Sequence, residues 1–265
     1  MVFVIAEAGV NHNGDLATAK ELVIAARTAK ADAVKFQVFD PGKLEPPGPR
    51  RDMLSNLYLS KPEFMALKSF ADDGSIEFMA TPFDVESLEF IVKLGVKRIK
   101  IGSADLHNMP LLKAARGAGL PLILSTGMAK LEDIRTNIGD TLLHCTSAYP
   151  CPLQDANLRA IRTMRMSSTV PHCKIGLSDH TASIAIPAAA VALGAEVIEK
   201  HLTLDRSQDG PDHKCSLEPS AFYDMVTGIR EVEAALGDGI KRPMPSEKAV
   251  MQIRDEREAW RCTTS

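Results

Sequence analysis

The chain lacks a strong excess of charge of either sign. Its 31 Lys and Arg residues against 34 Asp and Glu residues leave a formal net charge of −3, which gives no reason to expect a nucleic acid or an anionic membrane as a partner. It has no apolar run long enough to span a bilayer and no basic, cleavable leader before its first apolar segment. We therefore expect no nucleic-acid partner and no membrane partner.

Cysteine pairs at metal-binding spacing are also absent. The five cysteines are odd in number and none forms a C-x-x-C pair, which argues against a zinc cluster or a disulfide framework. We expect reduced thiols and a cytoplasmic protein. A G-x-G-x-x-G fingerprint is missing after the first apolar segment, which disfavours a dinucleotide-binding sheet.

Short β-rich apolar runs alternate with helical patterns along the 265 residues. Strands are predicted at 2–8, 33–39, 77–82, 98–103, 122–127, 142–149, 174–180 and 196–202. Helices are predicted at about 17–31, 63–74, 85–95, 109–118, 131–138, 157–166, 183–194 and 219–236. Eight β units, each followed by a helix, predict an α/β fold, a TIM (β/α)8 barrel, with an open doubly wound sheet as the fallback.

Two domain-level expectations follow. Residues 1–240 form the catalytic barrel, and residues 241–265 form a C-terminal tail or truncated linker that ends in a short charged helix. The longest non-periodic stretch, 40–60, contains four prolines in DPGKLEPPGPRR. Because it lies between the second strand and the next helix, we interpret it as a cover over the active site.

Polar residues gather where the predicted strands end, which is the catalytic face of a TIM barrel. Lys35 and Gln37 are two residues apart, as are Ser178 and His180, and Glu199 and His201, so each pair shares one face of its strand. Taken alone, each residue has an ordinary structural explanation, and Glu7 and Glu199 could pair with the lysines. Their joint placement favours a site.

The chemistry of these residue types is consistent. Lysines such as Lys35 and Lys100 suit a phosphate or carboxylate, and strand-end hydroxyls add hydrogen-bond donors. Two histidines from neighbouring strands, His180 and His201, suit a divalent metal ion. The Gly-rich phosphate loop common after strands 7 and 8 is absent, so side chains should hold the phosphate.

These residues resemble one family, the sialic acid synthases (N-acetylneuraminate, pseudaminic and legionaminic acid synthases). The motifs that carry the resemblance are IAEAGVNHNGD (5–15), VKFQ (34–37), MATPFD (79–84), KIGSADL (100–106), STGMA (125–129), LLHCTSAYPCPLQDANL (142–158), GLSDHT (176–181), EKHLTLDRSQDGPDH (199–213), SLEP (216–219) and KRPMPSE (241–247). GLSDHT together with EKHLTLDR…GPDH, after strands 7 and 8, is highly specific.

The resemblance implies a transferase that condenses phosphoenolpyruvate with an N-acetylated amino-sugar aldehyde, giving a nonulosonic acid and phosphate. It implies a divalent metal, first Mn²⁺ with Mg²⁺ or Co²⁺ as alternatives, held by His180 and His201. Phosphate contacts match Lys35, Lys100, Ser125, Ser178 and Ser147. Carboxylate contacts match Thr81 and Ser103, sugar-side residues match Gln37, Asp105, Tyr149 and Asp212, and Glu7 matches a site acid.

The chain departs from the family in two ways. Ser147 stands where some members have Asn, and Asp105 where several have Glu, so the acceptor need not be N-acetylmannosamine. The resemblance stops before the C-terminal antifreeze-like domain that many members use in a swapped dimer. A homodimer therefore stays an open expectation.

Three alternatives remain. A synthase of 3-deoxy-octulosonate phosphate type would need cations for a second phosphate, with Arg50 and Arg51 as candidates. A metal-dependent hydrolase would need further ligands or a water-activating base, and the first strand offers no HxH. A non-catalytic sugar-binding descendant would lack metal-dependent turnover.

Overall fold

The computed structural model of this chain describes residues 1–134, 136–137 and 139–264. Eight parallel strands form one sheet: β1 (Phe3–Gly9), β2 (Ala33–Val38), β3 (Glu77–Pro82), β4 (Ile99–Ile101), β5 (Leu122–Ser125), β6 (Thr141–Cys145), β7 (Lys174–Asp179) and β8 (Val197–His201). Their order is β3-β2-β1-β8-β7-β6-β5-β4. Because the two end strands, β3 and β4, lie against each other, the sheet curls into a nearly closed barrel, which confirms the predicted TIM fold.

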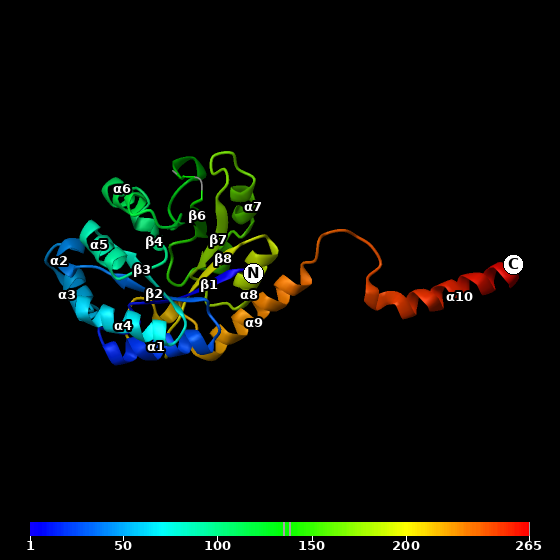
Figure 1. Ribbon diagram of the computed structural model, residues 1–265, viewed down its shortest axis with the longest axis horizontal. Coiled ribbons are helices and arrows are strands. Elements are labelled where there is room, and N and C mark those ends of the chain that lie inside the picture. The colour runs from blue at the N-terminus through cyan, green and yellow to red at the C-terminus, as the bar shows by residue number, and fades with distance from the viewer. Residues whose placement is uncertain (135, 138, 265) are drawn as a thin grey trace. The chain divides into compact units, whose positions relative to one another are not determined.

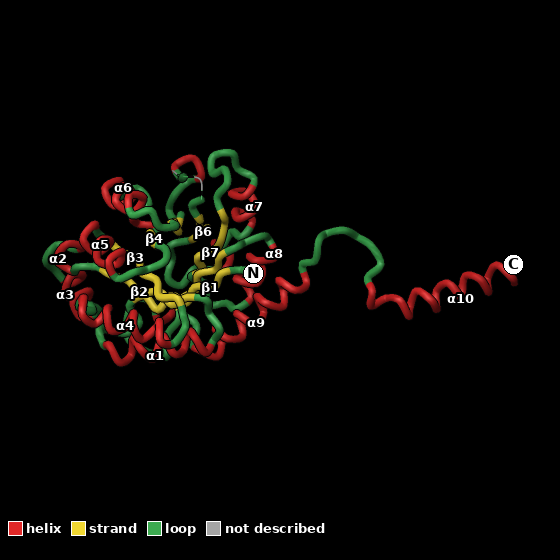
Figure 2. The backbone as a smooth tube through the Cα atoms, viewed as in Figure 1, coloured by secondary structure: helices red, strands yellow, loops and turns green. Residues whose placement is uncertain are grey.

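Helices cover the outside of this sheet (Figures 1 and 2). They are α1 (Leu16–Thr28), α2 (Pro41–Leu44), α3 (Pro49–Asn56), α4 (Lys61–Asp73), α5 (Val85–Lys93), α6 (Met109–Gly117), α7 (Arg159–Arg165), α8 (Ala185–Ala192) and α9 (Pro219–Ala235). A tenth helix, α10 (Lys248–Thr264), lies in the C-terminal unit of the chain. Several begin at side-chain caps: Asp15 accepts from the Thr18 amide, and Asp84 accepts from the Ser87 amide, which satisfies amide groups that the first helical turn leaves free.

The chain divides into two compact units, residues 1–233 and 234–265. The first holds all eight strands and the main core, in which outward-facing strand residues such as Val34, Phe36 and Phe78 pack under the helices. The second contains the end of α9 and α10. The buried apolar residues of the described chain run from Val2 to Ile229.

Three predicted segments need correction. The predicted fourth and sixth strands, 98–103 and 142–149, run too far: β4 ends at Ile101, before the 3-10 turn Ser103–Asp105, and β6 ends at Cys145. The helix predicted over 131–138 is wrong for its described part, which has only the 3-10 turn Leu131–Asp133; residues 135 and 138 lie outside the described residues. There the Asp140 side chain accepts from the Asn137 amide, a local bond that competes with helix formation.

The stretch 40–60 is more ordered than its prolines suggest. It contains α2 and α3, each with Pro at its start, a position where the missing proline amide costs nothing. Glycines follow the ends of several helices: Gly95, Gly119, Gly194 and Gly237 have positive φ angles, the conformation in which helices often end. Gly74 differs, with a φ of −77° at the end of α4.

Candidate active site

An apolar layer closes the lower part of the barrel interior. Six strands contribute to it, with Ile5, Ala33, Met79, Ile123, Leu143 and Val197. Side chains two residues further along a strand point to the same face. The next residues inward on these strands are Glu7, Lys35, Thr81, Ser125, Cys145 and Glu199, and all six line one cavity of about 480 Å³. The apolar layer therefore forms the base on which a polar layer lies.

The polar layer is built around two buried lysines. The Lys35 Nζ lies 2.7 Å from a Glu7 carboxylate oxygen and 3.6 Å from Glu199, and it donates to the Thr81 hydroxyl at 2.9 Å. The Lys100 Nζ lies 3.4 Å from Glu199. The pairing of lysines with Glu7 and Glu199, considered as a structural explanation from the sequence, is confirmed by these contacts.

Two hydroxyls complete this cavity floor. Ser178 donates to Glu199 at 2.9 Å, and the buried Ser125 hydroxyl has no hydrogen-bond partner among the described residues. A buried polar group without a partner costs free energy, about 1–3 kcal/mol. Ser125 is therefore available to a ligand that brings its own acceptor, as a phosphate would.

Burial and charge act in opposite directions on the four ionisable groups of the floor. Burial raises the pKa of Glu7, in spite of the opposing effect of Lys35. Burial would also raise the pKa of Glu199, but Lys100 and Lys35 outweigh it and lower that pKa to about 2. Burial lowers the pKa of Lys100, whereas Glu199 and Glu7 overcome burial at Lys35 and raise its pKa. The pKa shifts therefore favour the charged forms of Lys35 and Glu199 and the neutral form of Glu7.

Above the floor, three rings meet at the ends of strands β7 and β8 and in the loop after β6. The centroids of His180 and His201 are 5.3 Å apart, and Tyr149 lies 4.1 Å from His180. His180 Nδ1 lies 2.8 Å from the Thr146 carbonyl oxygen, to which it can only donate. A proton on Nδ1 leaves the lone pair on Nε2, as in metal-binding histidines held by a carbonyl oxygen.

The residues around His201 fit a divalent metal ion. His201 Nδ1 is buried without a hydrogen-bond partner among the described residues, and it lies 3.8 Å from an Asp212 carboxylate oxygen. Donor atoms of His201, Asp212 and Cys215 all lie within 4.8 Å of one another. Burial raises the pKa of Cys215 to about 12, so its thiol is protonated at neutral pH and a poor ligand. The set with the best donors is His180, His201 and Asp212.

Most of the residues predicted from the sequence come together in this cavity. Besides Lys35, Lys100, Glu7, His180 and His201, the lining includes Gln37, Thr81, Ser103, Ser125, Ser147, Tyr149, Ser178 and Asp212. Asp105 does not line it. It lies in the turn after β4, where it accepts a hydrogen bond from the Asn108 side chain at 2.9 Å.

Sequence reasoning assigned no catalytic or substrate-binding role to several residues that line the site. Glu199 contacts Lys35, Lys100 and Ser178. The sequence indicated only that Glu199 shares a strand face with His201. Met53 and Leu54 reach the cavity from α3, within the stretch 40–60 that we interpreted as a cover over the active site, although no periodicity marked these two residues. The Cys145 Sγ lies 3.8 Å from His180 Nδ1. Because Cys145 is two residues beyond Leu143 on the same strand, its side chain also points into the barrel.

The loop that carries Asp212 is tied to the loop after β1. The Asn11 side-chain amide donates to the Leu202 carbonyl oxygen and to the Ser216 hydroxyl, both at 2.9 Å. Ser216 in turn donates to the Asp212 carbonyl oxygen at 2.6 Å. Asn11 is buried, so these bonds are shielded from water. The VNHNGD segment therefore helps to position Asp212.

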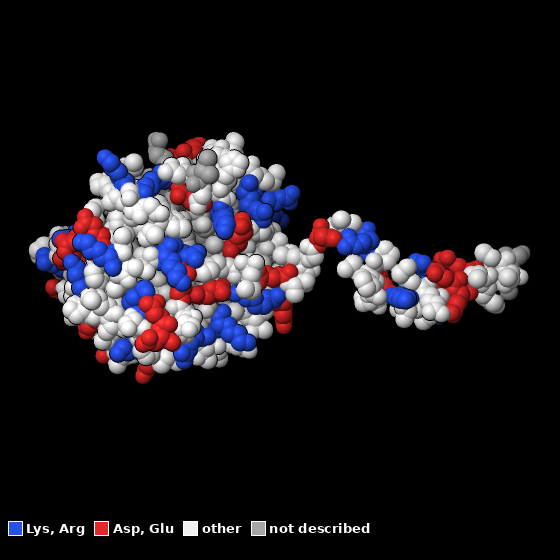
Figure 3. Space-filling model, in the orientation of Figure 1, with Lys and Arg blue, Asp and Glu red and all other residues white. Residues whose placement is uncertain are grey.

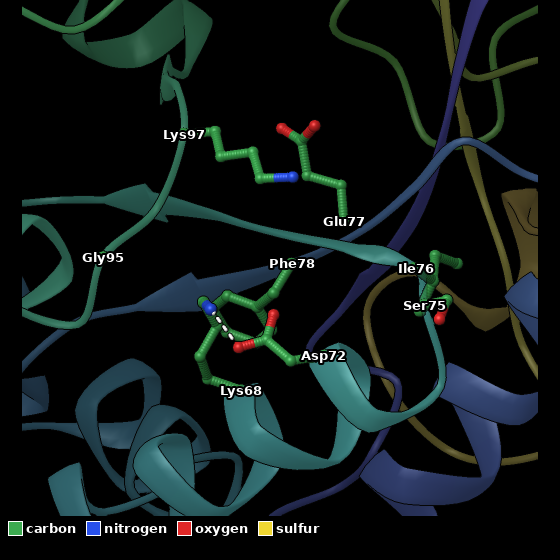
Figure 4. A pocket seen from close by; sticks show the side chains of 8 residues that line it. All are labelled: Lys68, Asp72, Ser75, Ile76, Glu77, Phe78, Gly95 and Lys97. Carbon is green, nitrogen blue, oxygen red and sulfur yellow. Dashed lines mark hydrogen bonds and ion pairs between the residues drawn. The ribbon is translucent and has the colours of Figure 1, made fainter.

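Other surfaces offer less chemistry. A second cavity, lined by Lys68, Asp72, Glu77 and Lys97 among others (Figure 4), lies at the starts of β3 and β4, the end of a TIM barrel where residues usually serve stability. Acidic and basic residues are interspersed on the face shown in Figure 3. None of the helices in the described chain combines the length and apolar character that crossing a bilayer requires.

The family model described as "NeuB family" matches residues 22–241. The chain is 43% identical to the N,N'-diacetyllegionaminic acid synthase of Legionella pneumophila, over 95% of this chain and 78% of that protein. It is 34% identical to the pseudaminic acid synthase of Campylobacter jejuni, over 90% and 76%. The crystal structure of an N-acetylneuraminic acid synthetase from Leptospira borgpetersenii in complex with citrate has a TM-score of 0.88 and 40% identity, and the match covers 96% of this chain and 91% of that one.

Proposed function

The chain belongs to the NeuB family, and we propose that it condenses phosphoenolpyruvate with the open-chain aldehyde of an N-acetylated amino sugar, giving a nonulosonic acid and phosphate. The observation that carries the proposal is the arrangement of the charged and metal-binding side chains along the barrel axis. Lys35 and Lys100 lie at its floor, and His180 and His201 lie above them. An anion and a metal-bound partner can therefore be held next to each other.

In the proposed reaction, C3 of phosphoenolpyruvate forms a bond with the aldehyde carbon, water adds at C2, and phosphate leaves with its bridging oxygen. Lys35, Lys100 and Ser125 hold the phosphate, and Thr81 and Ser103 hold the carboxylate end. Glu7, whose pKa burial raises, lies beside Gln37 at 3.3 Å and can orient water. A divalent ion, Mn²⁺ first among the candidates, would be held by His180, His201 and Asp212 and would supply Lewis acidity at the aldehyde oxygen.

The lining favours an acceptor without a phosphate group. Among the described residues that line the cavity, Lys35 and Lys100 are the only lysines or arginines. Arg50, a candidate for a second phosphate, is instead paired with Glu45 at 2.9 Å, with 81% of its side chain exposed. The outer lining is largely apolar, with Val10, Met53, Leu54, Phe83 and Pro211, which suits N-acyl and methyl groups. Arg51, the other candidate, does not line the cavity either, so the lining provides no cation for a second phosphate on the sugar.

The cellular setting is also part of the proposal. All five cysteines are free, as expected for a protein of the reducing cytoplasm. We also propose that the chain forms a homodimer. Residues 1–240 form the proposed catalytic barrel, and residues 241–265 form the proposed C-terminal tail.

The direct test measures phosphate release from phosphoenolpyruvate with Mn²⁺ and a panel of 2-acetamido and 2,4-diacetamido hexoses, with mass analysis of the products. We expect release only with a sugar present and a product whose mass is the sum of sugar and pyruvate. The matched control is a hexose 6-phosphate panel, which should release little. Binding of phosphoenolpyruvate and Mn²⁺ without turnover of any sugar would refute the proposed reaction.

A further inference from the structure

A completely buried ion pair lies directly behind the two histidines. The Lys200 Nζ lies 2.6 Å from an Asp179 carboxylate oxygen, and neither residue exposes more than 3% of its surface. Asp179 also accepts from the Thr181 amide at 2.9 Å and from its hydroxyl at 3.1 Å, and Lys200 donates to the Thr181 carbonyl oxygen. Both members of the pair therefore have further hydrogen bonds to Thr181, and nothing in the proposed reaction uses the pair.

Its place in the sheet explains what it can do. Lys200 lies between Glu199 and His201, and Asp179 lies between Ser178 and His180, so both point away from the barrel interior, opposite to those neighbours. The register pairs Ser178 with Glu199 and Asp179 with Lys200. The pair thus occupies the rung between the cavity floor and the two histidines.

That rung is the last one that the backbone ladder between β7 and β8 provides. β7 ends at Asp179, and His180 is one residue beyond it. Past this point the position of His180 depends on a few bonds: its Nδ1 to Thr146, its carbonyl oxygen accepting from the Cys151 amide at 2.9 Å, and the side-chain pair at its neighbour. The pair is therefore one of the contacts that hold the backbone next to His180.

We infer that Asp179 and Lys200 are positioning residues that set the spacing of His180 and His201 for one divalent ion. A buried ion pair is in general weak evidence for stability, because apolar residues of similar volume often serve as well. The hydrogen bonds of the pair have fixed directions, so they set the relative position of the ends of β7 and β8. Apolar side chains at the same place would let the two strand ends shift against each other. This inference depends on the metal site of the proposed function.

The test uses the double variant Asp179→Asn/Lys200→Met, which removes both charges and leaves no unpaired one. Mn²⁺ binding to the metal-free protein is measured by electron paramagnetic resonance of free Mn²⁺, and stability by urea unfolding. We expect the dissociation constant to rise about 10- to 100-fold, the usual effect of losing residues that orient metal ligands. Phosphoenolpyruvate affinity without metal should stay unchanged, because Lys35 and Lys100 are untouched.

The control is Glu77→Gln/Arg98→Met, which removes a different ion pair of the barrel wall, at 2.7 Å and far along the chain from either histidine. The control should change the Mn²⁺ dissociation constant by no more than about twofold. This is less than the rise of about 10- to 100-fold expected for the Asp179/Lys200 double variant. Wild-type Mn²⁺ affinity in the Asp179/Lys200 double variant would overturn the positioning role alone. A wild-type protein that binds no Mn²⁺ would overturn the metal site, and the positioning role with it.

A conservative variant decides the matter if the double variant folds poorly. Asp179→Glu keeps the charge and lengthens the side chain by one methylene group. If the pair serves only as a charge pair, the glutamate restores wild-type Mn²⁺ affinity, and the inference fails. If the pair sets geometry, Mn²⁺ affinity falls although the pair is retained, because metal sites tolerate displacements of only about 0.5 Å.

Discussion

Lys35 makes more polar contacts on the cavity floor than any other lysine, since Glu7, Glu199 and Thr81 all surround its Nζ. We predict that Lys35→Met weakens phosphoenolpyruvate binding by about 2–5 kcal/mol, the cost of truncating one partner of a buried charge pair. Isothermal titration calorimetry should show a dissociation constant raised about 30-fold or more. Lys113→Met, on the exposed side of α6, is the matched control. Equal affinities in the two variants would place Lys35 outside the phosphate site.

His180 gives a prediction on metal dependence. His180→Ala should abolish activation by Mn²⁺, because the variant removes a nitrogen ligand while the cavity floor keeps its contacts. Phosphate release measured against Mn²⁺ concentration should stay at background, and far-ultraviolet circular dichroism should match wild type. Full Mn²⁺ stimulation in the variant would contradict the ligand assignment.

His12 gives a prediction on pH and stability. It is 1% exposed, and burial lowers its pKa to about 4. Because the folded state resists protonation more than the unfolded state, whose histidine pKa is about 6.5, His12 contributes stability that is complete above pH 6.5 and is lost as the pH falls towards 4. Between pH 7.5 and pH 5 this loss amounts to about 2 kcal/mol.

The measurement compares wild type with His12→Asn in urea at both pH values. The asparagine oxygen can accept from the Gly14 amide as His12 Nδ1 does, at 3.1 Å, and it does not titrate. Between pH 7.5 and pH 5, the free energy of unfolding of wild type should fall by about 2 kcal/mol more than that of the variant. If wild type and variant lost the same free energy of unfolding, His12 would be protonated equally easily in the folded and unfolded states.

At the scale of elements, the loops after β1 and β8 behave as one unit through Asn11. Asn11→Asp keeps the shape but removes the two donated bonds to Leu202 and Ser216. We predict a loss of at least about 1–3 kcal/mol in the free energy of unfolding, because a buried carbonyl oxygen loses its donor and the new carboxyl group is buried without a counter-charge. The rate with the sugar should also fall, since Asp212 is held by the same loop.

Asn13→Asp is the control in the same loop. Its side-chain amide donates to Gln208 and to the Asp209 carbonyl oxygen at 3.3 and 3.2 Å, but at the surface. Water can replace these bonds, so the stability change should stay within about 0.5 kcal/mol. A destabilisation as large as that of Asn11→Asp would show that the burial of Asn11 is not the cause.

The elements also show what a sequence can and cannot predict. Strand periodicity identified the inward residues, because alternation is a property of the backbone: Lys35 and Gln37 share a face whatever surrounds them. The ion pair of Asp179 and Lys200 could not be predicted in the same way. Outward strand residues are exposed or buried according to which helix covers them, and that is decided by long-range packing. Asp105 failed to reach the cavity for a related reason, because a turn after a short strand directs it to Asn108.

At the scale of the whole molecule, the buried apolar residues that the structure describes all lie in the first compact unit. No residue after Ile229 is among the buried apolar residues of the described chain. We predict that a chain ending at Ile240, which removes α10 and keeps α9, unfolds at the same temperature as the full chain, within about 2 °C. Differential scanning calorimetry provides the measurement. Phosphoenolpyruvate affinity, set by Lys35 and Lys100, should also be unchanged.

A chain ending at Glu218 is the informative contrast, because it also removes α9. That helix buries Phe222, Met225, Val226 and Ile229, and its Arg230 pairs with Asp32 at 3.0 Å. Four buried side chains at about 1.5–3 kcal/mol each amount to roughly 6–12 kcal/mol, comparable to the whole stability of a typical domain at about 5–15 kcal/mol. The shorter chain should therefore be unfolded at room temperature. If the chain ending at Ile240 were destabilised as strongly, residues 241–265 would have to contribute to the barrel itself, and the boundary between barrel and tail would move towards the C-terminus.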